Sequence, residues 1–183
     1  MEALPDGFLP MLGTNFLKIV NKSILKYNLG FGFVYVTDGK VVGFVLACKD
    51  TGKLFKDIIK RKWTVLIISV LRKAIMKPSA LIKIYETLYY PKKESSDEIH
   101  AELLVIAIDK DYRGRKIGKN LIDNLNAKFL QENIYKYSVS VYSDNVSANK
   151  FYKSVGLRLE RSFKLYNKEF NVYVCELAKR KTE

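Results

Sequence analysis

Residues 101 to 130 constrain the fold most, because they predict a strand, a turn and a helix in immediate succession. The strand is AELLVIAI, and the turn runs from Asp109 to Arg115. Apolar side chains then recur on one stripe at helical spacing as far as about Leu130, which indicates an amphipathic helix. The stripe consists of Ile117, Leu121, Ile122 and Leu125.

Further elements are predicted on both sides of this unit. GFVYVT and KVVGFVLAC are two strand-like runs joined through Asp38 and Gly39, a pair that favours a type I′ hairpin. A helix from Thr14 or Asn15 to Gly30 is expected before them. On the C-terminal side, YSVSVYS alternates as a strand, residues 145–155 predict a helix, and residues around 157–164 and 171–177 predict two more strands.

Residues 53–90 are basic and strongly apolar. Helical spacing of Leu54, Phe55, Ile58 and Ile59 predicts inserted helices over about 52–90, and the polar residues 91–98 predict a loop. The apolar run WTVLIISVL is well short of the ~20 residues that span a bilayer. We therefore expect one domain over residues 1–183, with a helical insertion.

The composition fits a single globular domain and leaves its partners open. With 183 residues, 48% of them hydrophobic, the chain can fill one core without disulfides or a metal, and Cys48 and Cys175 are isolated. The formal charge of +13 attracts polyanions, so nucleic acid, anionic lipid and a phosphate-bearing cofactor are all candidates. Codon supply in an AT-rich genome is an alternative cause of this charge. Because residues 1–10 lack a secretory signal pattern, we expect a cytoplasmic protein.

The turn DYRGRKIGK combines features of an anion site. It lies where a strand meets a helix, so the first N–H groups of that helix lack intrahelical acceptors and the helix dipole favours an anion. Gly114 and Gly118 would let a ligand approach the backbone, and a pyrophosphate would fit. The cations of the turn are Arg113, Arg115, Lys116 and Lys119. Helix starts in basic proteins often share these features, and neither a GxxxxGK[ST] loop nor a complete dinucleotide fingerprint is present.

Two motifs resemble those of the GNAT acetyltransferase superfamily. Arg113, Ile117 and Gly118 match its [QR]xxGx[GA] signature, with Lys116 in place of the middle glycine. Residues 144–157, DNVSANKFYKSVGL, resemble its DNxxAxxFYxxxGF segment, with Leu157 in place of phenylalanine. The resemblance covers about residues 100–177. It implies an α/β GNAT fold, in which helices flank a mostly antiparallel twisted sheet that splays between the fourth and fifth strands.

The resemblance also implies a cofactor and a reaction. The pantetheine arm of acetyl-CoA would lie in the splayed gap, against the backbone of Ile106, Ala107 and Ile108. A primary amine would attack the thioester directly, with no metal and no acyl-enzyme. The remaining residues expected at the cofactor are Arg113, Gly114, Arg115, Lys116, Ile117, Gly118, Lys119, Asn145 and Tyr152.

Tyr152 and Glu102 are the expected catalytic residues. By resemblance, Tyr152 would protonate the leaving thiolate; the alternative is a tyrosine of the core. Glu102 shares strand parity with Leu104, Ile106 and Ile108, which predicts that it faces the same side and serves as the base. The only histidine, His100, has the same parity and is a second candidate. The alternative for both is a solvent-facing strand end, and Tyr142 is a weaker candidate for the substrate side.

The acceptor amine is not specified by the sequence. Relatives acetylate protein N-termini, lysine side chains, amino sugars, polyamines and antibiotics, so a small molecule or a peptide would serve. Basic residues and four aromatic residues of the insertion suggest a bulky or anionic acceptor: Trp63, Tyr85, Tyr89 and Tyr90. Alternatives are packing on the sheet, a homodimer interface, or weak contact of residues 53–77 with a membrane surface.

Two other classes of function are weighed against the enzyme. A non-catalytic acyl-CoA-binding module would keep the fold without turnover, but the presence of Tyr152 and Glu102 argues against it. A nucleic-acid-binding protein would account for the charge. However, no helix-turn-helix, RRM or OB pattern accompanies it, so no specific nucleic acid is expected.

Overall fold

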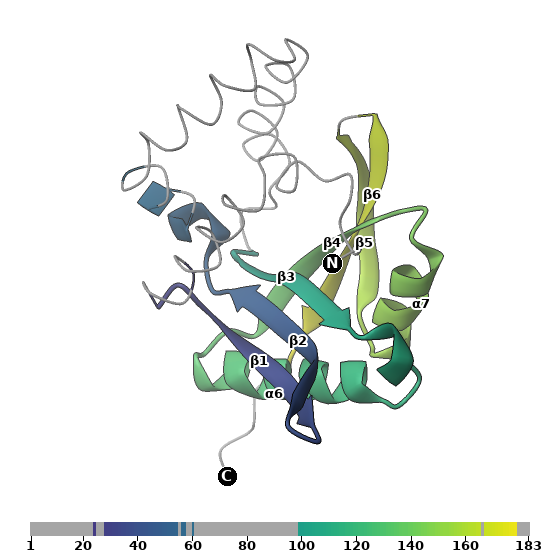
Figure 1. The fold of residues 1–183 in the computed structure, drawn as a ribbon. Coiled ribbons are helices and arrows are strands. Elements are labelled where there is room, and N and C mark those ends of the chain that lie inside the picture. Colours follow the sequence, from purple (N-terminus) through teal and green to yellow (C-terminus); the bar gives the residue numbers. More distant parts are fainter. Residues whose placement is uncertain are drawn as a thin grey trace, which may run out of the picture. The chain divides into compact units, whose positions relative to one another are not determined.

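The computed structural model describes residues 24, 28–54, 56–57, 60, 99–165 and 167–178 (Figure 1). The chain divides into two compact units, one of residues 1–29 with 52–98 and one of residues 30–51 with 99–183. The second unit holds nearly all of the described residues. Most of the predicted N-terminal helix, the insertion and the loop at 91–98 lies outside the described residues. Within the described chain, no helix is both long and apolar enough to cross a membrane.

Six strands form one mixed sheet in the order β1-β2-β3-β4-β6-β5. Only the neighbours β3 and β4 are parallel, and all other pairs are antiparallel. The strands are β1 (Gly30–Thr37), β2 (Lys40–Cys48), β3 (Ala101–Ile108), β4 (Lys136–Tyr142), β5 (Arg158–Leu165) and β6 (Lys168–Glu176). This arrangement confirms the predicted α/β class with a mostly antiparallel sheet.

The hairpin between β1 and β2 has the predicted turn. Asp38 and Gly39 have φ angles of 52° and 72°, the two positive values that a type I′ turn requires. Thr37 pairs with Lys40 directly across the turn. The two turn residues therefore determine both the turn type and the register at this end of the hairpin.

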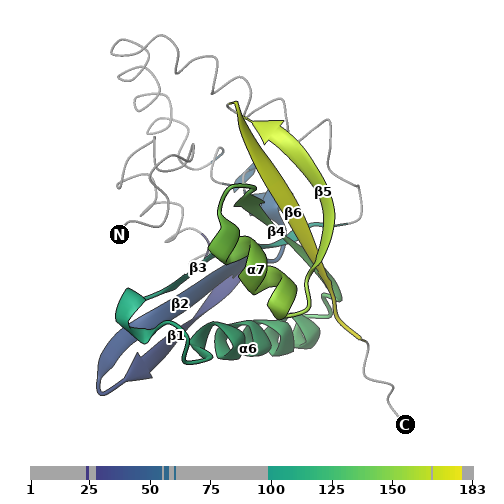
Figure 2. The same ribbon diagram turned by 90° about the vertical axis from the view of Figure 1, so that its right-hand side faces the viewer.

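Two helices cover the same face of the sheet. Helix α6 (Ile117–Gln131) follows β3, and helix α7 (Val146–Ser154) follows β4 (Figure 2). The predicted stripe of α6 is buried in one hydrophobic cluster with residues of β2, β3, β4, β6 and α7. At the far end of α6, the Phe129 ring stacks on Tyr137 of β4, with the ring centres 4.8 Å apart. Burial of each large apolar side chain of this kind stabilises the fold by about 1.5–3 kcal/mol relative to its exposure.

The sheet opens between β3 and β4. These strands pair only at Ala101 with Tyr137 and at Glu102 with Ser138. Beyond that point β3 continues to pair with β2, and β4 continues to pair with β6. The predicted splay between the fourth and fifth strands is therefore confirmed, and it lies between the strands labelled β3 and β4.

Gly118 allows α6 to pack closely against α7 and β3. A Cβ atom at this position would lie 2.8 Å from Cε2 of the Phe151 ring and 3.0 Å from Cδ1 of Ile108. Real Cβ atoms are almost never found at the first of these distances. The absence of a side chain at Gly118 therefore determines how near the two helices lie.

We expect Gly118→Ala to lower the free energy of unfolding by about 1–3 kcal/mol, because the added methyl group overpacks this contact. Alanine would otherwise stabilise a helix interior by about 1 kcal/mol relative to glycine, so the sign of the effect is diagnostic. Urea denaturation measures it. In a Phe151→Leu background, where the clashing ring atoms are absent, the loss should shrink; an equal loss in both backgrounds would contradict this explanation.

Candidate active site

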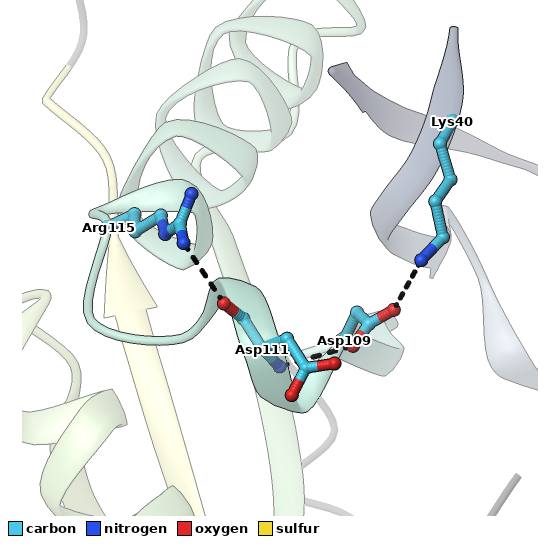
Figure 3. Close-up of polar contacts among 4 residues, drawn as sticks. All are labelled: Lys40, Asp109, Asp111 and Arg115. Atoms are coloured by element: carbon cyan, nitrogen blue, oxygen red, sulfur yellow. Dashed lines mark hydrogen bonds and ion pairs between the residues drawn. The ribbon is translucent and has the colours of Figure 1, made fainter. Parts of the chain in front are cut away.

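The turn after β3 is held by a chain of polar contacts (Figure 3). A short 3₁₀ helix (Lys110–Tyr112) follows Asp109, whose carboxylate accepts the backbone N–H of Asp111 at 3.2 Å. Lys40, the first residue of β2, donates to the same carboxylate at 3.3 Å, and Arg115 donates to the Asp111 carbonyl at 3.3 Å. The hydrogen bond from Asp111 and the contact with Lys40 lower the pKa of Asp109. These contacts define the path of the chain into α6.

Helix α6 begins without a side-chain cap. Its N-cap residue, Lys116, has φ 60° and ψ 9°, which is the left-handed region, and its side chain makes no capping hydrogen bond. The first helical bond is from the Asn120 N–H to the Lys116 carbonyl at 3.0 Å. The N–H groups before Asn120 therefore have no intrahelical acceptor and form a candidate anion site at the helix N-terminus.

The conformation of Lys116 explains why the family signature has glycine here. Glycine adopts positive φ readily, whereas for other residues this conformation costs about 1 kcal/mol. The other non-glycine residues with positive φ in the described chain are asparagine or aspartate, which tolerate this region: Asn28, Asp38, Asn133 and Asn167. Lys116 thus keeps the backbone shape of the motif and adds a cation.

The four cations of the turn are all exposed. Arg113 donates to the Ile108 carbonyl at 3.4 Å, and the Arg115 guanidinium lies 4.9 Å from the centre of the Tyr112 ring. Lys119 pairs with Asp123 at 3.0 Å, one turn along α6. Exposed pairs of this kind contribute about 0–1 kcal/mol, so they do not prevent these groups from engaging an anion.

The two glycines of the turn differ in their surroundings. A Cβ on Gly114 would meet no atom within 4 Å, and its φ is 77°, so a ligand has room to approach the backbone there. Gly118, in contrast, is buried under Phe151. The free space at Gly118 that the sequence suggested for a ligand is used for packing between the helices.

Three consecutive β3 residues border the gap in the sheet. Ile106, Ala107 and Ile108 pair with β2 on one side and have no partner strand on the β4 side. The Ile108 carbonyl accepts from Arg113, and the other backbone groups directed into the gap are candidate partners for an extended ligand that pairs like a strand. The turn at Arg113 follows directly at the open end.

Glu102 lies where the gap closes, and its side chain faces away from α6. Ala101 and Leu103 on either side of it belong to the core under α6. Ile106 and Ile108 also pack on this core, because the register between β2 and β3 shifts at Leu46 and Ala47. The predicted shared face of Glu102 with these two isoleucines is therefore wrong. A β-bulge reverses the alternation of side chains between them.

Burial raises the pKa of Glu102 to about 7. The carboxyl group is partly buried, and desolvation of its ionised form is the cause of the shift. A carboxyl with such a pKa is about half ionised at neutral pH, which suits a group that must accept and release a proton.

The other two candidates lie at the ends of their strands. His100 is exposed, and its carbonyl accepts the Thr51 N–H at 3.0 Å. Tyr142 ends β4, where its ring packs on Phe170 at 4.5 Å between centres and lies under the Lys168 ammonium at 4.9 Å. Tyr142 is four residues beyond Ser138, or about 13 Å along the strand, so it is remote from Glu102.

Tyr152 is buried in the hydrophobic core. The centre of its ring is 5.5 Å from that of Phe151 and 5.8 Å from that of Tyr173. Burial raises the pKa of the phenol to about 12, so it stays protonated at neutral pH. The alternative prediction of a core tyrosine is thus correct as to packing. Its protonation state also suits a proton donor.

Sequence reasoning missed Asn149, the buried polar side chain among the described residues. It lies in α7, one turn after Asn145, whose side chain caps the helix by accepting the Ala148 N–H at 3.1 Å. Asn149 bonds to the end of β4 and to β6. A polar residue on the buried side of a short amphipathic helix was the only signal in the sequence.

Fold and site together define a class of protein: a mixed sheet that opens beside a basic, uncapped helix N-terminus, as in acyltransferases that use a coenzyme A thioester. A family model described as "Acetyltransferase (GNAT) family" matches residues 6–157. The chain therefore belongs to the acetyltransferase (GNAT) family. The resemblance seen in the two sequence motifs is confirmed.

Solved structures share the fold at low sequence identity. One is a protein assigned as a streptothricin acetyltransferase from Bacillus anthracis str. Ames, in complex with acetyl coenzyme A (14% identity, 81% of this chain, 63% of that chain, TM-score 0.53). Ard1 from Thermoplasma volcanium is 15% identical over 90% of this chain and 79% of that one, with a TM-score of 0.55. PaiA N-acetyltransferase from Thermoplasma acidophilum, in complex with coenzyme A, is 15% identical over 87% and 68%, with a TM-score of 0.51.

The chain spans less than two thirds of the first of these proteins. A comparison with curated protein sequences gave no match. In the described part of the chain, no three histidine, cysteine or acidic side chains gather as a metal site.

Lys116→Gly should raise the free energy of unfolding by up to about 1 kcal/mol, because glycine relieves the positive φ at the start of α6. Lys119→Gly is the matched control: it removes a lysine from the same turn at a regular helical position and should cost about 1 kcal/mol. Urea denaturation of both variants measures the difference. Equal losses for the two would contradict the conformational explanation.

Glu102→Gln should remove a pH dependence of stability. The pKa of Glu102 is higher in the folded chain, about 7, than its ordinary value of 4.5, so the folded state binds more protons between these values. The stability of the natural chain should therefore fall by about 2–3 kcal/mol, relative to Glu102→Gln, as the pH rises from 4.5 to 8. Denaturation at several pH values measures this, with the exposed Glu169→Gln as the control for net charge. Parallel curves for all three proteins would rule it out.

Proposed function

We propose that the protein transfers the acetyl group of acetyl-CoA to a primary amine by direct attack. The observation that carries this proposal is the parting of β3 and β4 after Glu102 and Ser138, beside the uncapped N-terminus of α6. An extended pantetheine arm would pair with the backbone of Ile106, Ala107 and Ile108. The pyrophosphate would then meet the helix N-terminus at the open end of the gap.

The pyrophosphate site in this proposal is the segment from Arg113 to Lys119. Backbone N–H groups of Ile117, Gly118 and Lys119 would donate to the phosphate oxygens, with close approach allowed at Gly114. The side chains of Arg113, Arg115, Lys116 and Lys119 would add positive charge. Asn145, at the start of α7, would contact the cofactor from the β4 side of the gap.

Glu102 is proposed as the base and Tyr152 as the acid. The carboxylate takes a proton from the ammonium group, directly or through water; the amine nitrogen then bonds to the thioester carbon. A backbone N–H near Ile106 stabilises the oxyanion, and the C–S bond breaks as Tyr152 protonates the departing sulfur. The amide nitrogen releases its remaining extra proton to water, from which the Tyr152 phenolate is reprotonated, and Glu102 returns its proton to solvent. The pKa values of about 7 and about 12 support these roles, since one group is ready to accept a proton and the other retains its own.

The two groups lie on opposite sides of the sheet, which also supports the proposal. The Glu102 side chain faces away from the helices, whereas Tyr152 belongs to the core beneath them. A thioester in the gap would thus be reached by the amine from one face and by the acid from the other. The amine would arrive on the Glu102 face.

The acceptor is proposed to be the amine of a small molecule or of a peptide. One structural neighbour is described as a streptothricin acetyltransferase, and streptothricin is a small molecule. In this proposal residues 1–183 form one N-acetyltransferase domain, and the insertion at about 52–90 shapes the acceptor side. A homodimer and contact of residues 53–77 with a membrane surface stay predictions of the sequence.

A kinetic comparison tests the proposal. Purified protein is titrated with acetyl-CoA by calorimetry, and a library of amines is screened for release of the CoA thiol. Tyr152→Phe should bind acetyl-CoA normally but turn over about 10²–10⁴-fold more slowly. Glu102→Gln should lose the limb of the kcat/KM profile that rises near pH 7.

Arg113→Ala with Lys119→Ala is the control for binding. It should weaken acetyl-CoA affinity and its salt dependence with little effect on the chemical step. Acetyl-CoA binding without thiol release for any amine would favour the non-catalytic acyl-CoA-binding module. Unchanged turnover in Tyr152→Phe would remove that residue from its role.

A further inference from the structure

Asn149 uses the full hydrogen-bonding capacity of a buried amide. Its Nδ2 group donates to the carbonyls of Tyr142 at 2.8 Å and Asn145 at 2.7 Å, with a longer contact of 3.4 Å to that of Ser143. Its Oδ1 atom accepts from Nδ2 of Asn171 at 2.8 Å and from the Tyr173 hydroxyl at 2.9 Å. Two donors and two acceptor sites are thus all engaged.

These bonds join three parts of the fold. The donor contact to Tyr142 fastens α7 to the end of β4, and the contact to Asn145 lies at the start of α7 itself. The acceptor contacts fasten α7 to β6. Ser162 of β5 extends the network by donating to Oδ1 of Asn171 at 2.7 Å. A buried amide stabilises little over an apolar side chain of the same size, because its desolvation offsets its bonds. What such a satisfied network supplies is a single fixed geometry.

The hydrogen-bond network of Asn149 fixes the position of Tyr152. This residue lies three positions after Asn149, so its backbone belongs to the helical turn that the asparagine anchors. Tyr173 packs its ring on Tyr152, and the hydroxyl of that same Tyr173 is bonded to Asn149. Asn149 therefore restrains Tyr152 twice, through the helix and through the neighbouring ring.

We propose that Asn149 is a positioning residue for Tyr152, which it holds at the gap between β3 and β4. The inference rests on the proposed role of Tyr152 as the acid. Asn149 touches neither cofactor nor acceptor in this scheme. It acts by holding the phenol within reach of the sulfur, and small displacements of a catalytic group slow turnover steeply.

Two tyrosine variants give a matched comparison. Tyr173→Phe removes one hydroxyl bonded to Oδ1 of Asn149, and Tyr135→Phe removes one bonded to Oδ1 of Asn133 at 3.4 Å, in the segment between α6 and β4. Both delete one tyrosine hydroxyl and keep the ring. We expect kcat to fall about tenfold or more in Tyr173→Phe, with KM for acetyl-CoA nearly unchanged, and to stay near the natural value in Tyr135→Phe. Equal kcat values in the two variants would overturn the inference.

A double-mutant cycle separates positioning from a general structural role. Asn149→Ala and Tyr173→Phe are each measured alone and in a Tyr152→Phe background, with thermal denaturation to establish that each variant is folded at the assay temperature. If Asn149 acts through Tyr152, both substitutions should have little further effect on kcat once the phenol is absent. The same fold-loss in both backgrounds would mean that the network only supports the fold, and would overturn the inference.

If the proposed role of Tyr152 as the acid is itself wrong, the kcat values of the variants show a different pattern. If Tyr152→Phe alone keeps the natural turnover, the acid assignment fails, and the positioning inference fails with it. If Tyr152→Phe is slow but the losses multiply, only the role of Asn149 is contradicted. Tyr173→Phe keeps the cycle usable where Asn149→Ala does not fold.

Discussion

Two residue pairs hold the halves of the sheet together, and the rest of the site depends on them. Ala101 pairs with Tyr137 and Glu102 with Ser138, after which the parallel strands part. Helix α6 supports this junction between β3 and β4, because the Tyr137 ring stacks on Phe129 and the Tyr137 hydroxyl bonds to Asn126 of α6. If β3 and β4 paired along their whole length, no backbone group between them would be available to a ligand. If they did not pair at all, the strands would form two separate sheets. The short junction is what allows one core to support an opening.

Much of the fold was predictable from local sequence patterns. The positive φ angles of the hairpin follow from Asp38 and Gly39, and the buried stripe of α6 follows from apolar spacing. The direction of Glu102 was not predictable, since strict alternation fails where the register of β2 against β3 shifts. That shift is set by the pairing of residues about sixty positions apart, which a local pattern does not contain.

In the candidate site, too, features set by neighbouring residues were predictable, whereas features set by distant contacts were not. The basic turn and the helix start were visible in the sequence because donors, glycines and cations are adjacent there. The raised pKa of Glu102 and the bonds of Asn149 arise from burial and from contacts between distant elements. Lys116 stands between these cases: it departs from the family motif in chemistry but keeps its left-handed backbone, which only the structure reveals. The motifs therefore indicate a candidate site, and tertiary packing determines the burial and hydrogen bonds of the side chains proposed to act there.

The contact between Gly118 and Phe151 has a consequence for how the two motifs change together. Gly118 belongs to the first motif and Phe151 to the second, and each leaves the other no spare volume. A larger residue at one position requires a smaller one at the other, so the two segments are not free to vary independently. The residue that precedes Tyr152 thus sets a limit on the side chain tolerated at the start of α6. In the proposed function, the helix end that binds the cofactor and the helix that carries the acid are matched through a single pair of residues.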